Sequence, residues 1–188
     1  MESLEPVVNL FNEIGMLAKT PRSGFAFLGS GRQSVAEHSH RMTMIAYTLA
    51  ALSDEPLDIS KLLLMCLCHD LPEARTGDLN YVNKRYVKDD EAKIIDDLKD
   101  KTVVGKTISA YLTEYNENDS LEAQYAHDAD QLELLLVLKE QHEMGNQRAL
   151  KWFDNVEKRL QTKIGKSLAK TIQTTPADAW WQNQTGGT

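Results

Sequence analysis

Residues 62–70 read LLLMCLCHD, in which seven apolar side chains in succession lead directly to His69 and Asp70. Such a run, flanked by polar residues, is typical of a buried helix in a folded domain. Two ionisable side chains at the end of a buried segment need partners, because a polar group buried alone costs about 2–7 kcal/mol and a charge costs more. Either these two residues pair with each other and the backbone, or they hold a ligand.

The sequence on both sides of this stretch is helical in its periodicity. Apolar residues recur at helical spacing, and the predicted helices cover residues 4–17, 34–52, 59–70, 88–99, 103–115, 120–144, 147–161 and 163–173. SVAE at 34–37 is a capping-box pattern that begins one of them. No segment indicates a strand or a repeat. The sequence therefore predicts a single all-α domain over residues 1–180, with residues 181–188 as a flexible C-terminal tail.

Length and composition narrow the class of protein. A chain of 188 residues with 41% hydrophobic and 26% charged residues is long enough for one sizeable core. The net charge of −7 argues against a nucleic-acid polymer as partner, since such binding needs clustered Lys and Arg. A small anionic ligand is compatible with this net charge if a few cationic side chains or a metal ion lie in the site.

The chain also lacks the patterns of membrane and exported proteins. No segment approaches the roughly 20 apolar residues of a membrane span, and the N-terminal residues do not form a secretory signal. The only two cysteines, Cys66 and Cys68, are interpreted as reduced core thiols, which fits a reducing compartment. We expect a soluble, cytoplasmic protein without a membrane partner.

One histidine of the 34–52 helix is predicted to face the core. His38 precedes Met42, Ile45 and Leu49 at steps of four, three and four, so it lies at the head of an apolar stripe. His40 is about 200° away on the helix and is predicted to lie on the opposite side. A single inward histidine is usually a hydrogen-bonded core residue, and a second inward polar cluster would favour a shared ligand instead.

His69 and Asp70 form that second cluster. Imidazole and carboxylate are common ligands of divalent cations, and neighbouring residues at a helix end can reach the same ion. Glu73 follows one turn later. A His–Asp hydrogen bond at the helix end is the alternative, and the residues by themselves leave both open.

The 120–144 helix supplies two further carboxylates, in DADQLELL at 128–135. Asp128 and Asp130 lie about 200° apart on a helix, so they cannot both face the same ion. Both have apolar residues at helical spacing on their own side. Periodicity therefore does not choose between them.

Four segments together resemble a known family: PRSGF at 21–25, SVAEHSHRM at 34–42, HDLPEARTGD at 69–78 and DADQLELL at 128–135. They are similar to the HD-domain metal-dependent phosphohydrolases, and within these to the branch of 5′-deoxynucleotidases. A histidine, a His-Asp pair and a distant aspartate form the family's metal set, and E-x-x-T-G-D is typical of this branch. The resemblance implies an all-α HD-domain helical bundle with a metal site between its helices.

The same resemblance implies the metal ligands. One divalent ion would be held by His38, His69, Asp70 and Asp130, and the family's spacing favours Asp130 over Asp128. Ligands of this kind do not distinguish Co, Mn, Mg, Zn, Fe or Ni.

The substrate residues also follow from the resemblance. Glu73 matches the catalytic acid/base position, and Asp78 matches a catalytic position that contacts the sugar 3′-hydroxyl. Arg22 matches the arginine that binds phosphate, and Thr76 with Gly77 shapes the turn that presents Asp78. In the better-described bacterial relatives an aromatic residue, associated with rejection of ribose, follows this arginine. Here Ser23 follows it, which leaves the preference for deoxyribose open.

The predicted activity is hydrolysis of (deoxy)nucleoside 5′-monophosphates to nucleoside and phosphate. The alternatives are a deoxynucleoside triphosphate triphosphohydrolase and a catalytically silent metal- or nucleotide-binding module. A hydrolase of nucleotide second messengers is disfavoured, since no second metal cluster is recognisable. The branch is compatible with a homodimer, and Trp180 and Trp181 near the C-terminus are candidates for its interface or for docking on the body.

Overall fold

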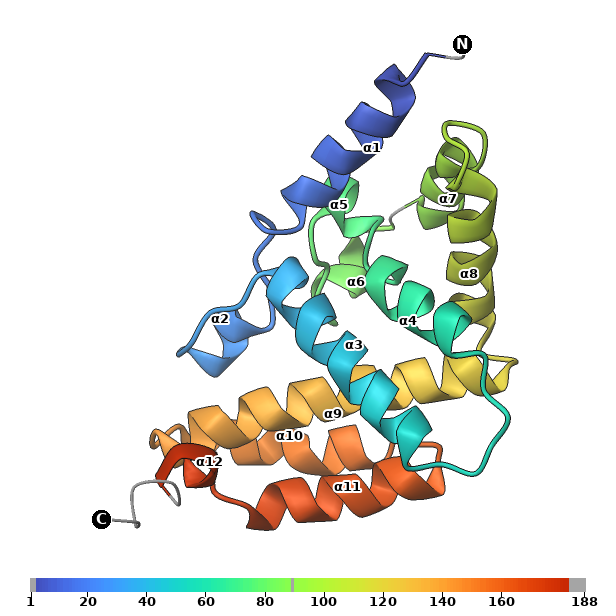
Figure 1. Ribbon diagram of the computed structural model, residues 1–188. Coiled ribbons are helices and arrows are strands. Elements are labelled where there is room, and N and C mark those ends of the chain that lie inside the picture. Colours follow the sequence, from blue (N-terminus) through green and yellow to red (C-terminus); the bar gives the residue numbers. More distant parts are fainter. Residues whose placement is uncertain (1–2, 89, 183–188) are drawn as a thin grey trace.

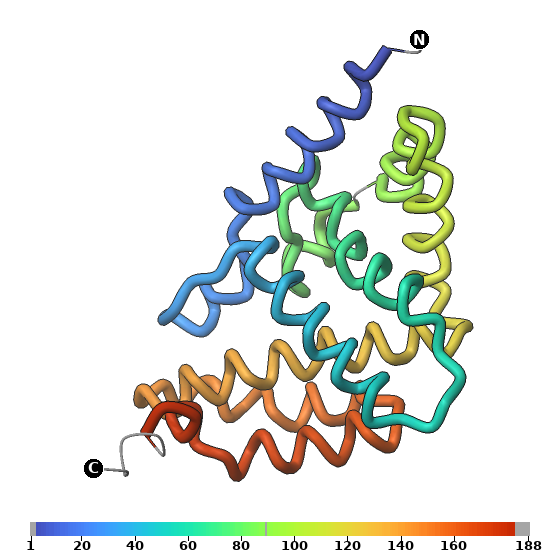
Figure 2. The backbone as a smooth tube through the Cα atoms, in the orientation of Figure 1, coloured from blue at the N-terminus to red at the C-terminus, as the bar shows by residue number. Residues whose placement is uncertain are grey.

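The computed structural model describes residues 3–88 and 90–182, and within them the chain forms helices and loops but no strand (Figures 1 and 2). The helices are α1 (Glu5–Met16), α2 (Phe25–Leu28), α3 (Val35–Ala51), α4 (Ile59–Cys68), α5 (Glu73–Thr76), α6 (Asn83–Tyr86), α7 (Glu91–Lys99), α8 (Gly105–Glu117), α9 (Leu121–Glu143), α10 (Gln147–Glu157), α11 (Lys163–Thr174) and α12 (Ala179–Gln182). The predicted all-α fold is confirmed. Helices α2, α5, α6 and α12 were not among the predicted helices, because four residues are too few to show a helical period. Of the predicted tail, residues 181 and 182 form the end of α12, and residues 183–188 lie outside the described part of the chain.

Helix α9 is the central element of the fold. It packs against α3, α4, α8, α10 and α11, and Figure 1 shows α10 and α11 running alongside it while α3 crosses it. Most of its side chains are buried, including Leu132, Leu135 and Leu138, which are fully enclosed. Burying each such side chain stabilises the fold by about 1.5–3 kcal/mol, so this helix holds the others together.

Helix α3 begins where the sequence predicts. The Ser34 hydroxyl accepts a hydrogen bond from the Glu37 amide at 3.2 Å, and the Ser34 amide donates to the Glu37 carboxylate at 2.6 Å, which completes the capping box. His38, Met42 and Leu49 are fully buried, as the apolar stripe predicts. The capped start of the helix therefore fixes which turn of α3 presents His38 to the interior.

A loop between α1 and α3 carries Arg22. It is closed at its base by the Arg22 amide, which donates to the Gln33 carbonyl oxygen at 2.9 Å, and by a backbone bridge between Pro21 and Ser34. This closure holds the loop and the short helix α2 beside the start of α3.

Two further sequence predictions can be compared with the structure. Cys66 and Cys68 are free and buried, as predicted for core thiols. In the part of the chain that is described, every helix is too short or too polar to cross a bilayer.

Candidate active site

Four predicted side chains meet between α3, α4 and α9. The Nε2 atoms of His38 and His69 lie 3.4 Å apart, and Asp130 Oδ1 lies 3.2 Å from His38 Nε2. Asp70 Oδ2 lies 3.1 Å from His69 Nε2 and 3.7 Å from His38 Nε2. His38 comes from the first turns of α3, the His69–Asp70 pair from the end of α4 and Asp130 from the middle of α9. Three helices distant in sequence thus direct two nitrogens and two oxygens at one point.

The outer ring nitrogens of both histidines are engaged elsewhere. His69 Nδ1 lies 2.9 Å from the Cys66 carbonyl oxygen, and His38 Nδ1 lies 2.6 Å from Glu133 Oε2. A carbonyl oxygen and a carboxylate accept hydrogen bonds, so each Nδ1 is the donor and carries a proton. This arrangement turns each Nε2 toward the cluster, as in histidines that bind metal ions.

The charges of the cluster balance one another. Burial acts to raise the pKa of Asp70, but the neighbouring His69 and Arg22 outweigh it and lower that pKa to about 2. Burial likewise acts to raise the pKa of Asp130, and the hydrogen bond from His38 lowers it well below its usual range. For His38, burial favours the neutral ring, yet Asp130 and Glu133 raise its pKa to about 9. Asp70 and Asp130 are therefore negatively charged, and a second proton on His38 compensates part of that charge.

This donor set fits a divalent metal ion. His38, His69 and Asp130 offer ligand atoms that all lie within 4.8 Å of one another, and Asp70 adds a second carboxylate. Two imidazole nitrogens with carboxylate oxygens suit borderline divalent cations. A cation at this point would replace the proton on His38 and satisfy both carboxylates.

The structure distinguishes the two aspartates that periodicity left open. Asp130 lies in the cluster, whereas Asp128 is fully buried on another side of α9. The Asp128 carboxylate accepts hydrogen bonds from the amides of Gln161 and Thr162, at 2.7 and 2.9 Å, and from the Thr162 hydroxyl at 2.6 Å. Asp128 therefore secures the start of α11 and takes no part in the cluster.

Glu73, the first residue of α5, lies one turn beyond the cluster. Its Oε2 atom is buried, and none of the described residues forms a hydrogen bond with it. Burial, together with the negative charges of Asp70 and Asp78, raises the pKa of Glu73 to about 9. A buried polar atom without a partner costs about 1–3 kcal/mol. Glu73 is thus prepared for a partner from outside the chain, such as water or a substrate oxygen.

Arg22 and Asp78 lie on neighbouring loops beside the cluster. Arg22 Nη1 is 3.2 Å from Asp70 Oδ2, and the negative charges around Arg22 raise its pKa despite its burial. Asp78 Oδ2 accepts a hydrogen bond from the Ser23 amide at 2.7 Å, and Asn80 Nδ2 donates to the Ser23 hydroxyl at 3.2 Å. Ser23 therefore ties the arginine loop to the loop that carries Asp78.

Thr76 and Gly77 shape the turn before Asp78. The Thr76 hydroxyl donates to the Gly77 carbonyl oxygen at 2.9 Å. Gly77 has a φ of +72°, a conformation that glycine adopts without strain. The Thr76 hydroxyl is used inside the turn, and Thr76 does not line the cavity that Arg22 and Asp78 line.

A cavity of about 510 Å³ lies beside Arg22, whose guanidinium contacts Asp70 of the cluster. Arg22, Gln33 and Asp78 form one part of its wall. Aromatic and polar side chains form much of the rest: Phe25, Phe27, Asn80, Tyr81, Trp152, Asn155 and Arg159. Its volume is typical of small-molecule sites.

Sequence reasoning missed two groups of residues here. Glu133, which contacts His38, interrupts an apolar run three residues after Asp130, and that position on the same helix face was the available signal. Asn155 and Arg159, in and just after α10, reach the cavity as well. Nothing in their sequence pattern separates them from an ordinary exposed helix face.

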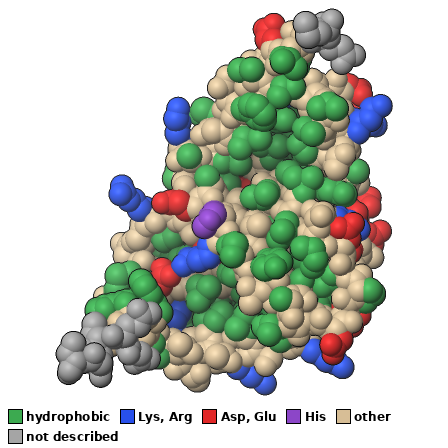
Figure 3. All heavy atoms as spheres, in the orientation of Figure 1, with side chains coloured by type: hydrophobic (Ala, Val, Ile, Leu, Met, Phe, Trp, Pro, Cys, Tyr) green, Lys and Arg blue, Asp and Glu red, His purple; other side chains and the backbone are tan. Residues whose placement is uncertain are grey.

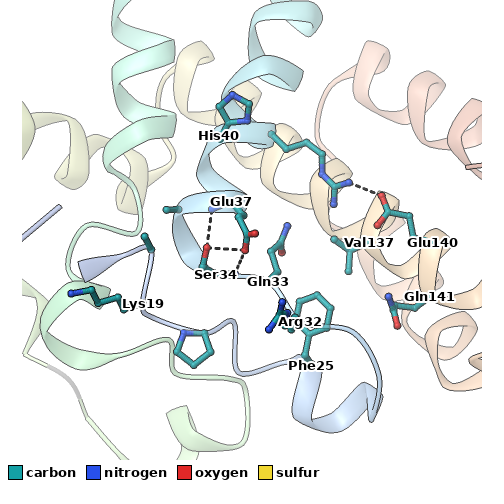
Figure 4. Close-up of a pocket in the computed structure, with 14 residues that line it drawn as sticks. Lys19, Phe25, Arg32, Gln33, Ser34, Glu37, His40, Val137, Glu140 and Gln141 are labelled. Atoms are coloured by element: carbon teal, nitrogen blue, oxygen red, sulfur yellow. Dashed lines mark hydrogen bonds and ion pairs between the residues drawn. The ribbon is translucent and has the colours of Figure 1, made fainter. Parts of the chain in front are cut away.

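A larger hollow of about 950 Å³ opens on another side of Gln33. Figure 4 shows Lys19, Arg32, Gln33, Ser34, Glu37 and His40 around it, with Val137, Glu140 and Gln141 of α9. His40 is exposed at this hollow and lies outside the cluster, in agreement with its predicted orientation. Gln33, Phe25 and Val137 line both the hollow and the 510 Å³ cavity, so they form the wall between the two.

The fold and the site define an all-α protein with a His/His-Asp/Asp cluster between its helices. The chain belongs to the HD domain family, which it matches over residues 14–173. It is 28% identical over 149 residues to 5′-deoxynucleotidase HDDC2 of Danio rerio, covering 75% of this chain and 72% of the relative. It is 27% identical to the protein of the same name from Dictyostelium discoideum, covering 88% and 96% of the two chains. A conserved hypothetical protein from Pyrococcus furiosus has a similar structure, with a TM-score of 0.75, 26% identity and coverage of 89% and 99%.

Proposed function

We propose that this chain is a metal-dependent phosphohydrolase that converts (deoxy)nucleoside 5′-monophosphates to nucleoside and phosphate. The observation that carries the proposal is the buried, unpaired Oε2 atom of Glu73, which follows the His69–Asp70 pair of the cluster by one turn. Arg22 and Asp78, whose charges act on Glu73, line a cavity of suitable size. A site that only binds a metal ion or a nucleotide does not need an acid or base such as Glu73 beside the metal ligands. The relatives named 5′-deoxynucleotidase support the choice of substrate.

In this proposal His38, His69, Asp70 and Asp130 would hold one divalent cation. When bound, the cation supplies positive charge that stabilises the phosphoryl oxygens and promotes ionisation of water. Glu73 accepts a proton from the attacking water or delivers one to the leaving 5′-oxygen. One ion is proposed because a single cluster of this kind is found in the described residues, and elemental analysis of the purified protein tests the number.

Residues that line the cavity are proposed to bind the phosphate, the sugar and the base of the nucleotide. Arg22, whose guanidinium now contacts Asp70, has the planar fork that binds phosphate in a bidentate manner. Asp78 has one oxygen committed to Ser23, and its other oxygen is the proposed acceptor for the sugar 3′-hydroxyl. Phe27 and Tyr81, whose ring centres are 5.6 Å apart, offer aromatic surface for the base.

Product analysis tests this proposal and its main competitor. The purified protein is incubated with deoxy- and ribonucleoside mono- and triphosphates and with Co²⁺, Mn²⁺ or Mg²⁺. We expect orthophosphate and nucleoside from monophosphates. Tripolyphosphate from triphosphates would instead identify a triphosphohydrolase, and metal binding without any turnover would indicate a silent binding module. The ratio of deoxy to ribo turnover measures selectivity with Ser23 in place of an aromatic residue.

We further propose that the protein is a cytoplasmic homodimer. Its free, buried thiols suit a reducing compartment. Large apolar side chains are exposed at α1, where Leu4 just before the helix and Phe11 within it are 73% and 63% exposed, and on α12, where Trp180 is 72% exposed. Figure 3 shows hydrophobic side chains gathered on the face near the N-terminus.

Removing the residues after Pro176 is expected to shift the chain from dimer to monomer in size-exclusion chromatography with light scattering. The truncation deletes both exposed tryptophans of α12 and leaves the helices of the core intact. Phe11→Asp, which places a charge on the exposed face of α1, is the companion variant. An unchanged mass after truncation would remove α12 from the interface, and a monomeric full-length chain would contradict the dimer.

A further inference from the structure

Glu133 is a charged side chain in the middle of the core. Its residue surface is 0% exposed, and it lies on α9 among leucines that are equally buried. A carboxylate in such a place is strongly unfavourable unless it is fully paired. Its partners therefore explain why it is there.

The two oxygens of Glu133 have separate tasks. Oε1 accepts hydrogen bonds from Arg41 Nε at 2.9 Å, Arg41 Nη2 at 2.7 Å and Gln33 Nε2 at 2.7 Å. Among the described residues, Oε2 has one hydrogen-bond partner, His38 Nδ1 at 2.6 Å. Three donors on one oxygen fix the carboxylate, and the other oxygen fixes the ring of His38.

We propose that Glu133 is a positioning residue for His38, held in place by Arg41 and Gln33, and that it sets the affinity of the cluster for its metal ion. The inference rests on the proposed metal site. By accepting a hydrogen bond from Nδ1, Glu133 keeps the proton on that nitrogen and orients the imidazole ring. It also makes Nε2 a stronger electron-pair donor to a metal ion. No described residue other than Glu133 contacts His38 Nδ1.

The supporting residues have the geometry that this role needs. Arg41 donates from Nε and Nη2 to the same oxygen of Glu133, through charge-assisted hydrogen bonds that leave Oε2 for His38. Its Nη1 binds Glu140 at 2.6 Å. Gln33 lies in the wall between the hollow of Figure 4 and the substrate cavity. The network thus connects a metal ligand to a side chain that lines the substrate cavity.

Glu140 provides a matched control. It binds the same guanidinium as Glu133, at similar distance, but it is partly exposed and does not reach His38. A purely structural role for the Arg41 ion pairs predicts small and similar effects of replacing either carboxylate. A positioning role predicts a large effect at Glu133 alone.

The experiment is titration calorimetry of the metal-stripped protein with Mn²⁺ or Co²⁺, for the wild type, Glu133→Gln, Glu133→Ala and Glu140→Gln. Metal affinity should fall by about 10–100-fold in Glu133→Ala, as for other outer partners of metal-binding histidines. Glu133→Gln, which keeps an acceptor without the charge and guards against failure to fold, should fall between this variant and the wild type. Glu140→Gln should match the wild type.

A second readout separates positioning from general stability. In the zinc-loaded protein, the strongly deshielded Nδ1 proton of His38 should be visible by NMR in the wild type and in Glu140→Gln, and should be lost or shifted in both Glu133 variants. Unchanged metal affinity and an unchanged proton signal in folded Glu133→Gln would overturn the inference. Absence of nucleotidase activity in a wild type that binds metal would overturn the proposed function alone.

Discussion

Replacing Glu73 by glutamine is expected to lower kcat/KM for nucleoside monophosphates by about 10²–10⁴-fold, the usual contribution of a general acid or base. Glutamine has the shape of the protonated acid but cannot take up or release a proton. Since Glu73 lies outside the His/Asp cluster, the metal content should stay that of the wild type. Initial rates of phosphate release, together with elemental analysis of the same sample, measure both quantities.

Glu117→Gln serves as the control for this substitution. Glu117 is an exposed acid at the end of α8 and does not line the cavity, so its variant should match the wild type in rate and metal content. Loss of metal from Glu73→Gln would assign Glu73 to the metal site instead. A wild-type rate would remove it from the chemistry.

The same substitution should change how the stability of the metal-stripped protein depends on pH. The pKa of Glu73 is raised to about 9 in the folded chain from an ordinary value of 4.5. Its contribution to stability is therefore fully present below pH 4.5 and is lost as pH rises toward 9, because the unfolded chain releases the proton first. Glu73→Gln should be more stable than the wild type at pH 8.5 and should lose most of that advantage at pH 5. Urea denaturation in the presence of a chelator measures the difference.

Asp130→Asn and Asp128→Asn should have different effects, the first on metal binding and the second on stability, although only one residue separates the two positions. Asp130→Asn should weaken metal binding by more than about 100-fold, since removing a direct ligand exceeds the effect of an outer partner. Asp128→Asn should leave metal affinity unchanged and lower the free energy of unfolding by about 1–3 kcal/mol. The reason is that the amide group turns a donor or a weaker acceptor toward the backbone N–H groups of Gln161 and Thr162.

Calorimetric metal titration and urea denaturation of the stripped proteins test this pair of variants together. Metal loss from a stably folded Asp128→Asn would show that Asp128 controls the cluster through α11. Wild-type metal affinity in Asp130→Asn would exclude Asp130 as a ligand. The wild-type chain measured in parallel sets the reference for both quantities.

Much of the fold follows from local signals in the sequence. The apolar periodicity of residues 35–51 predicted α3 to within a few residues, because a buried face repeats with the helical period where a helix packs on one side. Ser34 and Glu37 marked the start of α3 for an equally local reason, since a capping box involves only four residues. The inward direction of His38 follows from the same helix geometry.

The family resemblance supplied what periodicity could not. The two rows of α9 that contain Asp128 and Asp130 are both apolar because α9 is buried on nearly all sides. A helix without a solvent-exposed face has no pattern that separates one inward acid from another. Only the motif favoured Asp130, and only the packing of α11 against α9 explains Asp128.

The all-α class and the principal helices could be predicted from the sequence alone, because they depend on contacts within a few turns. The residue types of the metal cluster were predicted from motifs that resemble those of the family. The tertiary structure decided which distant groups meet. It placed Glu133 behind His38, left the Glu73 carboxylate without a partner among the described residues, and joined Arg22, Asp78 and α10 around one cavity. Those relations depend on how α3, α4, α9 and α10 pack against one another. The apolar period of a helix shows that one face is buried, but it does not show which other helix that face meets.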